Sequence, residues 1–380
     1  MSANKTFQLN TGQLLPAVGF GTWMGWPPTG TDGGTTAEEN YHAVLAALRA
    51  GYRHIDTAAV YRVEEAVGRA LKDSGIPRSE IFVTTKLDCP DHGRVADALG
   101  ESLKRLDLDY VDLYLIHWPQ GAGAAKDVTP LETWLQMEKL VGIEKVKAIG
   151  VSNFSEKTFA SLLEKGSIVP AVNQVEVHPY LPSIQLREFH DKHGIHTMAY
   201  SPLGGQLQTQ LLGNKNTLLA DEVISEIAKS HLVTPGQVLL AWNVLNGSSV
   251  IPKSANPERM KANLELPALG KEEMKRIDEL HRSEGKHQRL ATPPQGLHGW
   301  SYQDLGWDVH RGPDRHSRMR RGSDSQLRRM SFYVRSRSCF GMSGIGEARN
   351  TPIPICLIAI PEASRSCARG VGTYRDLLRL

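Results

Sequence analysis

The chain has 380 residues, of which 40% are hydrophobic and 22% charged, a composition typical of soluble globular proteins. No apolar run approaches the roughly 20 residues that a membrane-spanning helix needs, and the N-terminus lacks the basic start and apolar stretch of a secretory signal. The net charge of +3 divides unevenly, because the segment from Arg311 onward carries fourteen arginines and five acidic residues, leaving a mildly acidic body that is not typical of a nucleic-acid-binding protein.

Helical and strand-like patterns alternate between about residues 41 and 286. The first helix is expected at 38–50, because Tyr41, Val44, Leu45 and Leu48 recur at helical spacing and Gly51 follows. Further helices are expected at 63–75, 94–106, 132–141, 157–166, 184–194, 221–231 and 235–245. Strands are expected between them at 54–58, 81–87, 110–118, 146–152, 170–177, 195–202 and 248–252.

An eighth strand fits near residues 18–21, ahead of the first helix. Eight strand–helix units in one unbroken series favour a closed (β/α)8 barrel over an open, doubly wound sheet. We therefore expect residues 1–307 to form one α/β barrel with its active site at the C-terminal ends of the strands. No GxGxxG motif follows a strand near the N-terminus, so a Rossmann-type dinucleotide site is not supported.

Four polar residues stand at or just after the ends of the expected strands: Asp56, Tyr61, Lys86 and His117. A tyrosine can donate a proton to a carbonyl oxygen if a nearby ammonium lowers its pKa from about 10. Lys86 can supply that charge, Asp56 can hold Lys86 by ion pairing, and His117 can orient the carbonyl group. Taken alone, a tyrosine or histidine at such a position is more often structural, and Lys86 and Asp56 could form an ordinary ion pair.

The segments HIDTAAVY, VTTKL and LYLIHW, in this order and spacing, resemble the catalytic tetrad of the aldo-keto reductase family. The resemblance covers about residues 7–307. It implies reduction of aldehydes and small ketones to alcohols, with a hydride from NADPH and a proton from Tyr61. The WPPTGTDGG loop and the HWP sequence resemble fungal members, which implies glyceraldehyde, dihydroxyacetone or sugar-acid aldehydes as substrates. The alternative is an NADPH-binding sensor or regulatory barrel with little turnover.

The same resemblance implies where the cofactor binds. Ser152, Asn153 and Gln174 match the residues that hydrogen-bond the nicotinamide carboxamide, although a Ser-Asn pair after a strand is also a common helix cap. Tyr200 matches the aromatic residue that stacks on the nicotinamide ring. The stretch from Ser201 to Leu203 matches the start of a loop on the phosphate side.

A basic loop, IPKSANPERMKANL, follows the last expected strand. Two cations with hydroxyl and amide donors suit a phosphate monoester, and the loop resembles the family's site for the adenosine 2′-phosphate. That resemblance favours NADPH over NADH, whereas the alternative is a solvated basic helix start. The residues concerned are Lys253, Ser254, Asn256, Arg259 and Asn263.

Trp23 and Trp118 match aromatic walls of the family's substrate pocket, which His117 would also line; packing in the core is the alternative role for both tryptophans. No metal site is expected, because the fourteen histidines are scattered and no HExxH motif occurs. The four cysteines show no CxxC pairing, which indicates a reducing, cytoplasmic setting.

Beyond the barrel pattern, residues 296–307 look like an ordered tail that folds across the barrel mouth. Residues 308–380 form an arginine-rich extension, which is either disordered, or translated sequence that is not natural coding sequence, or an arm that binds nucleic acid or membrane. The extension lacks aromatic interleaving and amphipathic periodicity, so the first two possibilities are favoured. We therefore expect a monomer whose partner is a small carbonyl compound, without nucleic acid or membrane.

Overall fold

The computed structural model describes residues 5–23, 37–205, 218–291 and 299–307 of the chain. The loop expected at 26–36, the first part of the expected tail and the extension at 308–380 lie outside these ranges. In the described ranges, no helix is long and apolar enough to cross a membrane.

The strands form a parallel sheet whose order follows the chain. Its members are β3 (Phe20–Gly21), β4 (His54–Asp56), β5 (Phe82–Leu87), β6 (Val111–Ile116), β7 (Val146–Ser152), β8 (Val172–Glu176), β9 (His196–Tyr200) and β10 (Ser249–Val250). A parallel bridge joins Val18 to Val250, so the first edge meets the last. Because the sheet closes on itself, the fold is a (β/α)8 barrel, which confirms the architecture expected from the sequence.

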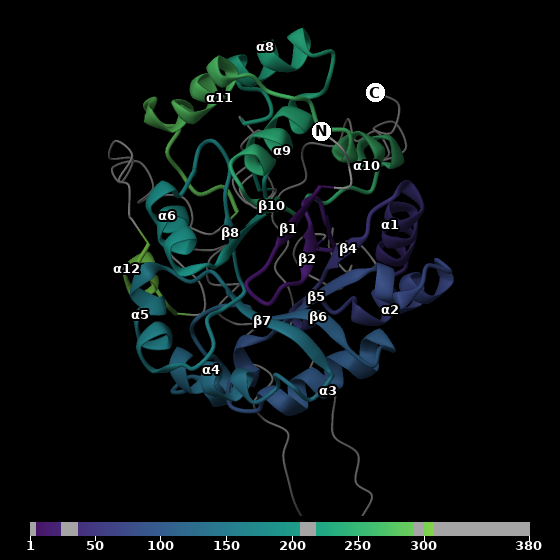
Figure 1. Cartoon of the computed structure of the whole chain (residues 1–380), viewed down its shortest axis with the longest axis vertical. Helices are drawn as coiled ribbons and strands as arrows, with labels where there is room; N and C mark the ends of the chain where they lie inside the picture. The colour runs from purple at the N-terminus through teal and green to yellow at the C-terminus, as the bar shows by residue number, and fades with distance from the viewer. Residues whose placement is uncertain (1–4, 24–36, 206–217, 292–298, 308–380) are drawn as a thin grey trace, which may run out of the picture. The chain divides into compact units, whose positions relative to one another are not determined.

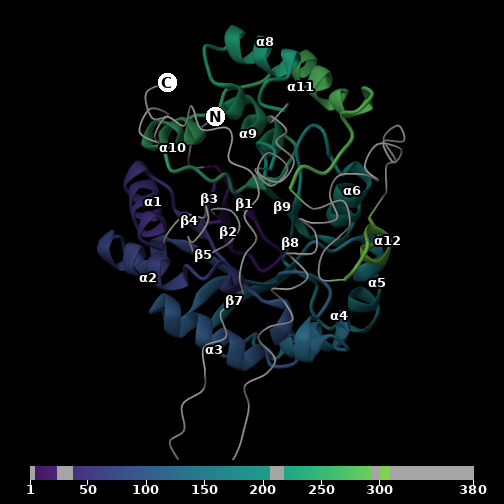
Figure 2. The same ribbon diagram turned by 180° about the vertical axis from the view of Figure 1, so that it is seen from behind.

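Helices surround this sheet (Figure 1). They are α1 (Ala37–Ala50), α2 (Glu64–Asp73), α3 (Val95–Leu106), α4 (Pro130–Glu138), α5 (Glu156–Lys165), α6 (Ile184–His193), α8 (Glu222–Ser230), α9 (Pro235–Leu245), α10 (Pro257–Leu264), α11 (Lys271–Asp278) and α12 (Tyr302–Leu305). Neighbours in the chain pack together from α1 to α5, and α10 packs against both α9 and α1 (Figures 1 and 2). The helical ring therefore shields the outer face of the barrel.

An antiparallel hairpin, β1 (Thr6–Gln8) and β2 (Leu14–Pro16), precedes the barrel strands. The ring centroids of Phe7 and His196, the first residue of β9, are 4.8 Å apart. The Asn10 amide donates to the carbonyl of Pro170, just before β8. Both contacts lie at the N-terminal ends of the barrel strands. The hairpin thus covers the barrel interior at this end, and the C-terminal ends of the strands form the other end.

Side chains along each strand point alternately into the barrel and toward the helices. In β5, Phe82 packs with Leu113 and Met198 inside the barrel, whereas Val83 and Leu87 belong to the layer between the sheet and the helices. Lys86 lies four residues after Phe82 and therefore on the same face of β5, so its side chain points into the barrel at the C-terminal end. The polar residues at strand ends identified from the sequence therefore share one interior.

Candidate active site

Four residues from three neighbouring strand ends meet at the C-terminal end of the barrel. Asp56 ends β4, Lys86 is the penultimate residue of β5, and His117 follows β6 directly. Tyr61 ends the 3₁₀ turn η1 (Ala59–Tyr61), which leads from β4 toward α2. The structure thus brings together all four residues proposed from the sequence, although they are up to 61 positions apart in the chain.

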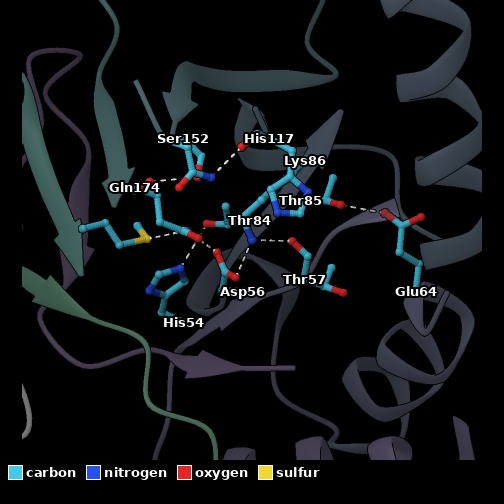
Figure 3. A network of polar contacts seen from close by, with 12 residues as sticks. His54, Asp56, Thr57, Glu64, Thr84, Thr85, Lys86, His117, Ser152 and Gln174 are labelled. Atoms are coloured by element: carbon cyan, nitrogen blue, oxygen red, sulfur yellow. Dashed lines mark hydrogen bonds and ion pairs between the residues drawn. The ribbon is translucent and has the colours of Figure 1, made fainter. Parts of the chain in front are cut away.

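Asp56 and Lys86 form an ion pair inside the barrel, with 2.5 Å between Oδ1 and Nζ (Figure 3). Both side chains are almost completely buried, at 2% and 0% exposure. The lysine ammonium also donates to the carbonyl oxygen of Thr57 at 2.9 Å. Burial raises the pKa of Asp56 and lowers the pKa of Lys86, while their mutual attraction opposes both shifts.

The phenol ring of Tyr61 lies between aromatic and cationic neighbours. Its centroid is 5.0 Å from that of Trp23, 5.6 Å from that of His117, and 5.1 Å from the Lys86 ammonium. Burial raises the pKa of the Tyr61 hydroxyl well above its ordinary value, and the charge of Asp56 raises it further. The net direction is opposite to the lowering expected from the sequence, because burial is the larger effect on the pKa of the phenol. Tyr61 is therefore protonated at neutral pH, which suits a proton donor.

Polar side chains from β7 and β8 adjoin this group (Figure 3), and Tyr200 of β9 joins them through Asn153. Asn153 adopts a left-handed backbone conformation with φ of 66° just after β7. Its amide nitrogen donates to the carbonyl of His117 at 2.9 Å, and its amide oxygen accepts the hydroxyl of Tyr200 at 2.9 Å. Ser152 donates to the carbonyl of Gln174 at 2.8 Å. These contacts fix the backbone and ring positions on the side of the mouth next to His117.

Gln174 connects the Asp56–Lys86 ion pair with the polar residues of β7. Its amide nitrogen donates to Oδ2 of Asp56 at 2.7 Å and contacts the Met198 sulfur at 3.0 Å. Gln174 therefore stabilises the Asp56 carboxylate, a role that its sequence context did not suggest. Ser201, with φ of 47°, and Leu203 begin the loop after β9, and both are half-buried. Leu203 and the other residues proposed for cofactor binding in this region thus stand at the same end of the barrel.

The basic loop lies between β10 and the N-terminus of α10. Asn256 caps that helix by accepting the backbone N–H of Arg259 at 2.9 Å, and the Ser254 hydroxyl contacts both backbone groups of Asn256. Burial lowers the pKa of Lys253, and the nearby charge of Arg259 lowers it further, so the two cations are neighbours. Within the described ranges, neither forms an ion pair. Two neighbouring cations at a helix N-terminus fit a phosphate. Asn263, in α10, contacts the hydroxyl of Tyr52.

Three residues absent from the sequence-based set also belong to this end of the barrel. The Thr22 hydroxyl is buried without a hydrogen-bond partner among the described residues, and its backbone N–H donates to the carbonyl of Asp56 at 3.0 Å. Glu176 ends β8, and Trp307 packs against Trp118 with ring centroids 5.6 Å apart. The position of Thr22 in GFGTW, at a strand end, was a usable signal for Thr22. Trp307 belongs to the tail expected to fold across the mouth, although no local pattern indicated that Trp118 would be its partner.

Comparisons with known proteins agree with this geometry. Residues 17–282 match the model of the aldo/keto reductase family. Glycerol 2-dehydrogenase (NADP(+)) of Saccharomyces cerevisiae is 42% identical over 77% of this chain and 95% of its own length, and D-galacturonate reductase of Hypocrea jecorina is 38% identical over 77% and 96%.

Among solved structures, an aldo-keto reductase of Bombyx mori in complex with NADP superimposes with a TM-score of 0.70. It is 35% identical and covers 77% of this chain and 97% of that one. A family model that spans most of the described barrel, together with relatives near 40% identity, shows the family. The chain belongs to the aldo/keto reductase family.

Proposed function

We propose that this NADP-dependent oxidoreductase reduces aldehydes and small ketones to alcohols, with Tyr61 as the proton donor to the carbonyl oxygen. One observation carries the assignment of roles: the buried Asp56–Lys86 pair lies directly against the ring of a protonated tyrosine. That tyrosine also contacts His117 at the end of the barrel where enzymes of this architecture place their active sites.

The mechanism follows from what each side chain can do. When bound, NADPH supplies the hydride that the carbonyl carbon receives. Tyr61 donates its hydroxyl proton to the carbonyl oxygen as negative charge develops there, and the Lys86 ammonium stabilises the resulting phenolate. His117, adjoining the Tyr61 ring, orients the carbonyl oxygen. Asp56 keeps Lys86 charged in a site where burial alone would favour the neutral amine. Solvent then reprotonates Tyr61.

The polar residues around the mouth fit the cofactor in two groups. Ser152, Asn153 and Gln174 would hold the nicotinamide carboxamide, and Tyr200 would stack on the ring. Asn153 and Gln174 already make hydrogen bonds within the protein, so the carboxamide would exchange for some of these contacts. Ser201 and Leu203 would border the bridging phosphates. The basic loop would bind the 2′-phosphate, through Lys253, Ser254, Asn256, Arg259 and Asn263.

Polyhydroxylated carbonyl compounds are the proposed substrate class. Two similar proteins are named for polyhydroxylated compounds: glycerol 2-dehydrogenase for an alcohol whose oxidation yields a carbonyl group, and D-galacturonate reductase for a sugar acid. We therefore propose glyceraldehyde, dihydroxyacetone and sugar-acid aldehydes as the first compounds to examine. Trp23, which packs on Tyr61, and Trp118, which follows His117, would form the apolar walls of the site.

Replacing Tyr61 with Phe tests the proton-donor role. Removal of one general acid lowers rates by roughly 10²–10⁴-fold, so Tyr61→Phe should nearly abolish NADPH oxidation across an aldehyde panel. NADPH affinity, measured by fluorescence titration, should remain close to that of the unchanged protein.

Tyr114→Phe is the matched control, because the Tyr114 hydroxyl is buried in the helix-facing layer and has no hydrogen-bond partner in the part of the chain that the structure describes. A near-normal rate in Tyr61→Phe would refute the role. Cofactor binding without turnover by the unchanged protein would favour the sensor alternative.

The two cations of the basic loop should determine the preference between cofactors. Because a hydrogen bond to a charged group contributes about 1.5–3 kcal/mol, Lys253→Ala or Arg259→Ala should weaken NADPH binding by roughly 10- to 100-fold. NADH binding, which lacks the 2′-phosphate, should change little. Lys261→Ala, an exposed cation later in the same helix, should leave both affinities unchanged. Equal losses for NADPH and NADH would overturn the assignment.

A further inference from the structure

Glu176 has a buried carboxylate that faces a segment far away in the chain. Its side chain is fully buried at the C-terminal end of β8. Oε1 accepts the backbone N–H groups of Leu290 and, at 2.9 Å, of Ala291, and it lies 3.1 Å from Nε2 of His178. Oε2 lies 3.9 Å from the guanidinium of Arg289. Burial of a carboxylate is costly unless donors surround it, so residues 289–291 and Glu176 stabilise one another.

Arg289 extends this contact to the aromatic residues at the barrel mouth. Its guanidinium carbon lies 3.8 Å from the ring centroid of Trp307, close enough for a cation–π interaction. Trp307 is only 6% exposed and packs at 5.6 Å against Trp118, the residue after His117. A continuous chain of contacts therefore runs from Glu176 through Arg289 and Trp307 to Trp118.

The same C-terminal segment is held at two further points. Lys286 donates to Oδ2 of Asp221 at 2.5 Å, and Tyr180 donates to the same oxygen at 2.7 Å. On the other side, α12 lies beside α5 in both views of the barrel (Figures 1 and 2), where the Lys157 ammonium donates to the carbonyl of Gln303 at 3.1 Å. Among these anchors, the Glu176 contact is the one that connects through Arg289 directly to the indole of Trp307.

We propose that Glu176 is a positioning residue for substrate selection, because it holds Arg289 so that Trp307 stays against Trp118 as a fixed wall beside the carbonyl site. The proposal rests on the proposed function for the meaning of that site. A fixed apolar wall favours substrates with an aromatic or other apolar body next to the carbonyl group. Small polar aldehydes lack such an apolar body, so they depend on the wall little.

Glu176→Gln tests the proposal, because the amide retains an oxygen acceptor for Leu290 and Ala291 but loses the charge that attracts Arg289. Loss of a charge-assisted contact should raise KM for an aromatic aldehyde such as 4-nitrobenzaldehyde by about tenfold. KM for glyceraldehyde, kcat for glyceraldehyde and the Kd of NADPH should stay within about twofold, as expected for loss of positioning alone. Arg289→Gln is the second variant, for use if Glu176→Gln folds poorly. It preserves the backbone contacts of Glu176 and should also raise KM for the aromatic aldehyde.

Glu64→Gln is the matched control. Glu64 is an equally buried carboxylate that accepts from Thr85 at 2.6 Å and from Arg105 at 2.7 Å, in the layer between β5 and the helices. Its substitution should lower the thermal midpoint without changing the ratio of the two KM values. An equal change of that ratio in Glu64→Gln and Glu176→Gln would overturn the proposal, because the effect would then be a general loss of stability.

A readout independent of catalysis separates this proposal from the proposed function. The fluorescence of Trp307 is obtained as the difference between each protein and its Trp307→Phe counterpart. Acrylamide should quench this fluorescence more strongly in Glu176→Gln than in the unchanged protein. Unchanged quenching together with an unchanged KM ratio would overturn the proposal. If the unchanged protein reduces no carbonyl compound, the proposed function fails, and the quenching measurement still decides whether Glu176 holds Trp307 in place.

Discussion

Asp56 and Lys86 are charged groups that the barrel removes almost completely from solvent. Each makes the burial of the other tolerable, with Gln174 and the Thr57 carbonyl completing their hydrogen bonds. A single replacement leaves one buried charge without its counterion. The energetic role of the pair can therefore be separated from its chemical role by replacing one residue or both.

Lys86→Met should lower the free energy of unfolding by about 3–5 kcal/mol, because the Asp56 carboxylate remains buried without a cation. The double variant Asp56→Asn/Lys86→Met should recover a substantial part of that loss, since it removes both charges. Carbonyl reduction should be lost in Lys86→Met and should not return in the double variant, because Tyr61 lacks its neighbouring ammonium in both. Urea unfolding combined with NADPH oxidation assays measures the two properties. No recovery in the double variant would contradict the account of mutual compensation.

The sequence predicted these residues well because each occupies a local context at a strand end. Asp56, Lys86 and His117 follow strand patterns that fix their direction into the barrel, and the structure brings them together with Tyr61. The pKa direction of Tyr61 was not predictable, because it depends on how burial and the distances to Lys86 and Asp56 combine. Glu176 was also missed, since its partners lie 114 and 115 residues away in the chain.

At the scale of elements, strand and helix order followed from the alternation of patterns, whereas short or closely packed elements did not. The hairpin of β1 and β2 has strands of three residues, too short for a period-two pattern to emerge. The helix expected at 132–141 starts earlier, at Pro130, because Thr129 and Glu132 form a capping box. Close approach between helices is likewise invisible in a sequence, and glycines in two neighbouring helices illustrate this.

Gly68 in α2 and Gly100 in α3 should respond oppositely to replacement by alanine. A Cβ at Gly68 would lie 2.2 Å from the carbonyl oxygen of Leu106, so Gly68→Ala should destabilise the protein by roughly 1–3 kcal/mol through overpacking. A Cβ at Gly100 meets no atom within 4 Å, so Gly100→Ala should stabilise by about 0.5–1 kcal/mol through helix propensity. Urea midpoints of the two variants measure the difference. Changes of the same sign would show that the α2–α3 packing is not as described.

At the scale of the whole molecule, we expect stability to fall in acid because of histidines enclosed in the barrel and its helical layer. Burial lowers the pKa of His54 to about 3, of His190 to about 3 and of His196 to about 4, from the usual 6.5. His54 contacts Thr84, His190 contacts Thr197, and His196 contacts Ser249, each near 3 Å. These histidines are neutral in the folded protein across the physiological range.

The direction of the pH effect follows from where the protons bind. Below pH 6.5 the unfolded chain takes up a proton at each of these three positions, whereas the folded protein does not until about pH 3–4. The stability that neutral burial preserves is thus complete above pH 6.5 and is lost progressively on acidification. Between pH 7 and 5 each histidine should contribute a loss of roughly 2 kcal/mol.

Urea unfolding at a series of pH values should show this loss as a positive slope of unfolding free energy against pH, approaching about 1.4 kcal/mol per unit for each histidine. His196→Gln or His190→Gln should each lower that slope by about 1.4 kcal/mol per pH unit, the contribution of one proton, because glutamine does not titrate. The two substitutions should reduce the slope by the sum of their separate effects, since each removes one site of proton uptake from the unfolded chain. A slope that neither substitution alters would place the acid sensitivity in other groups and contradict the burial of these rings as neutral side chains.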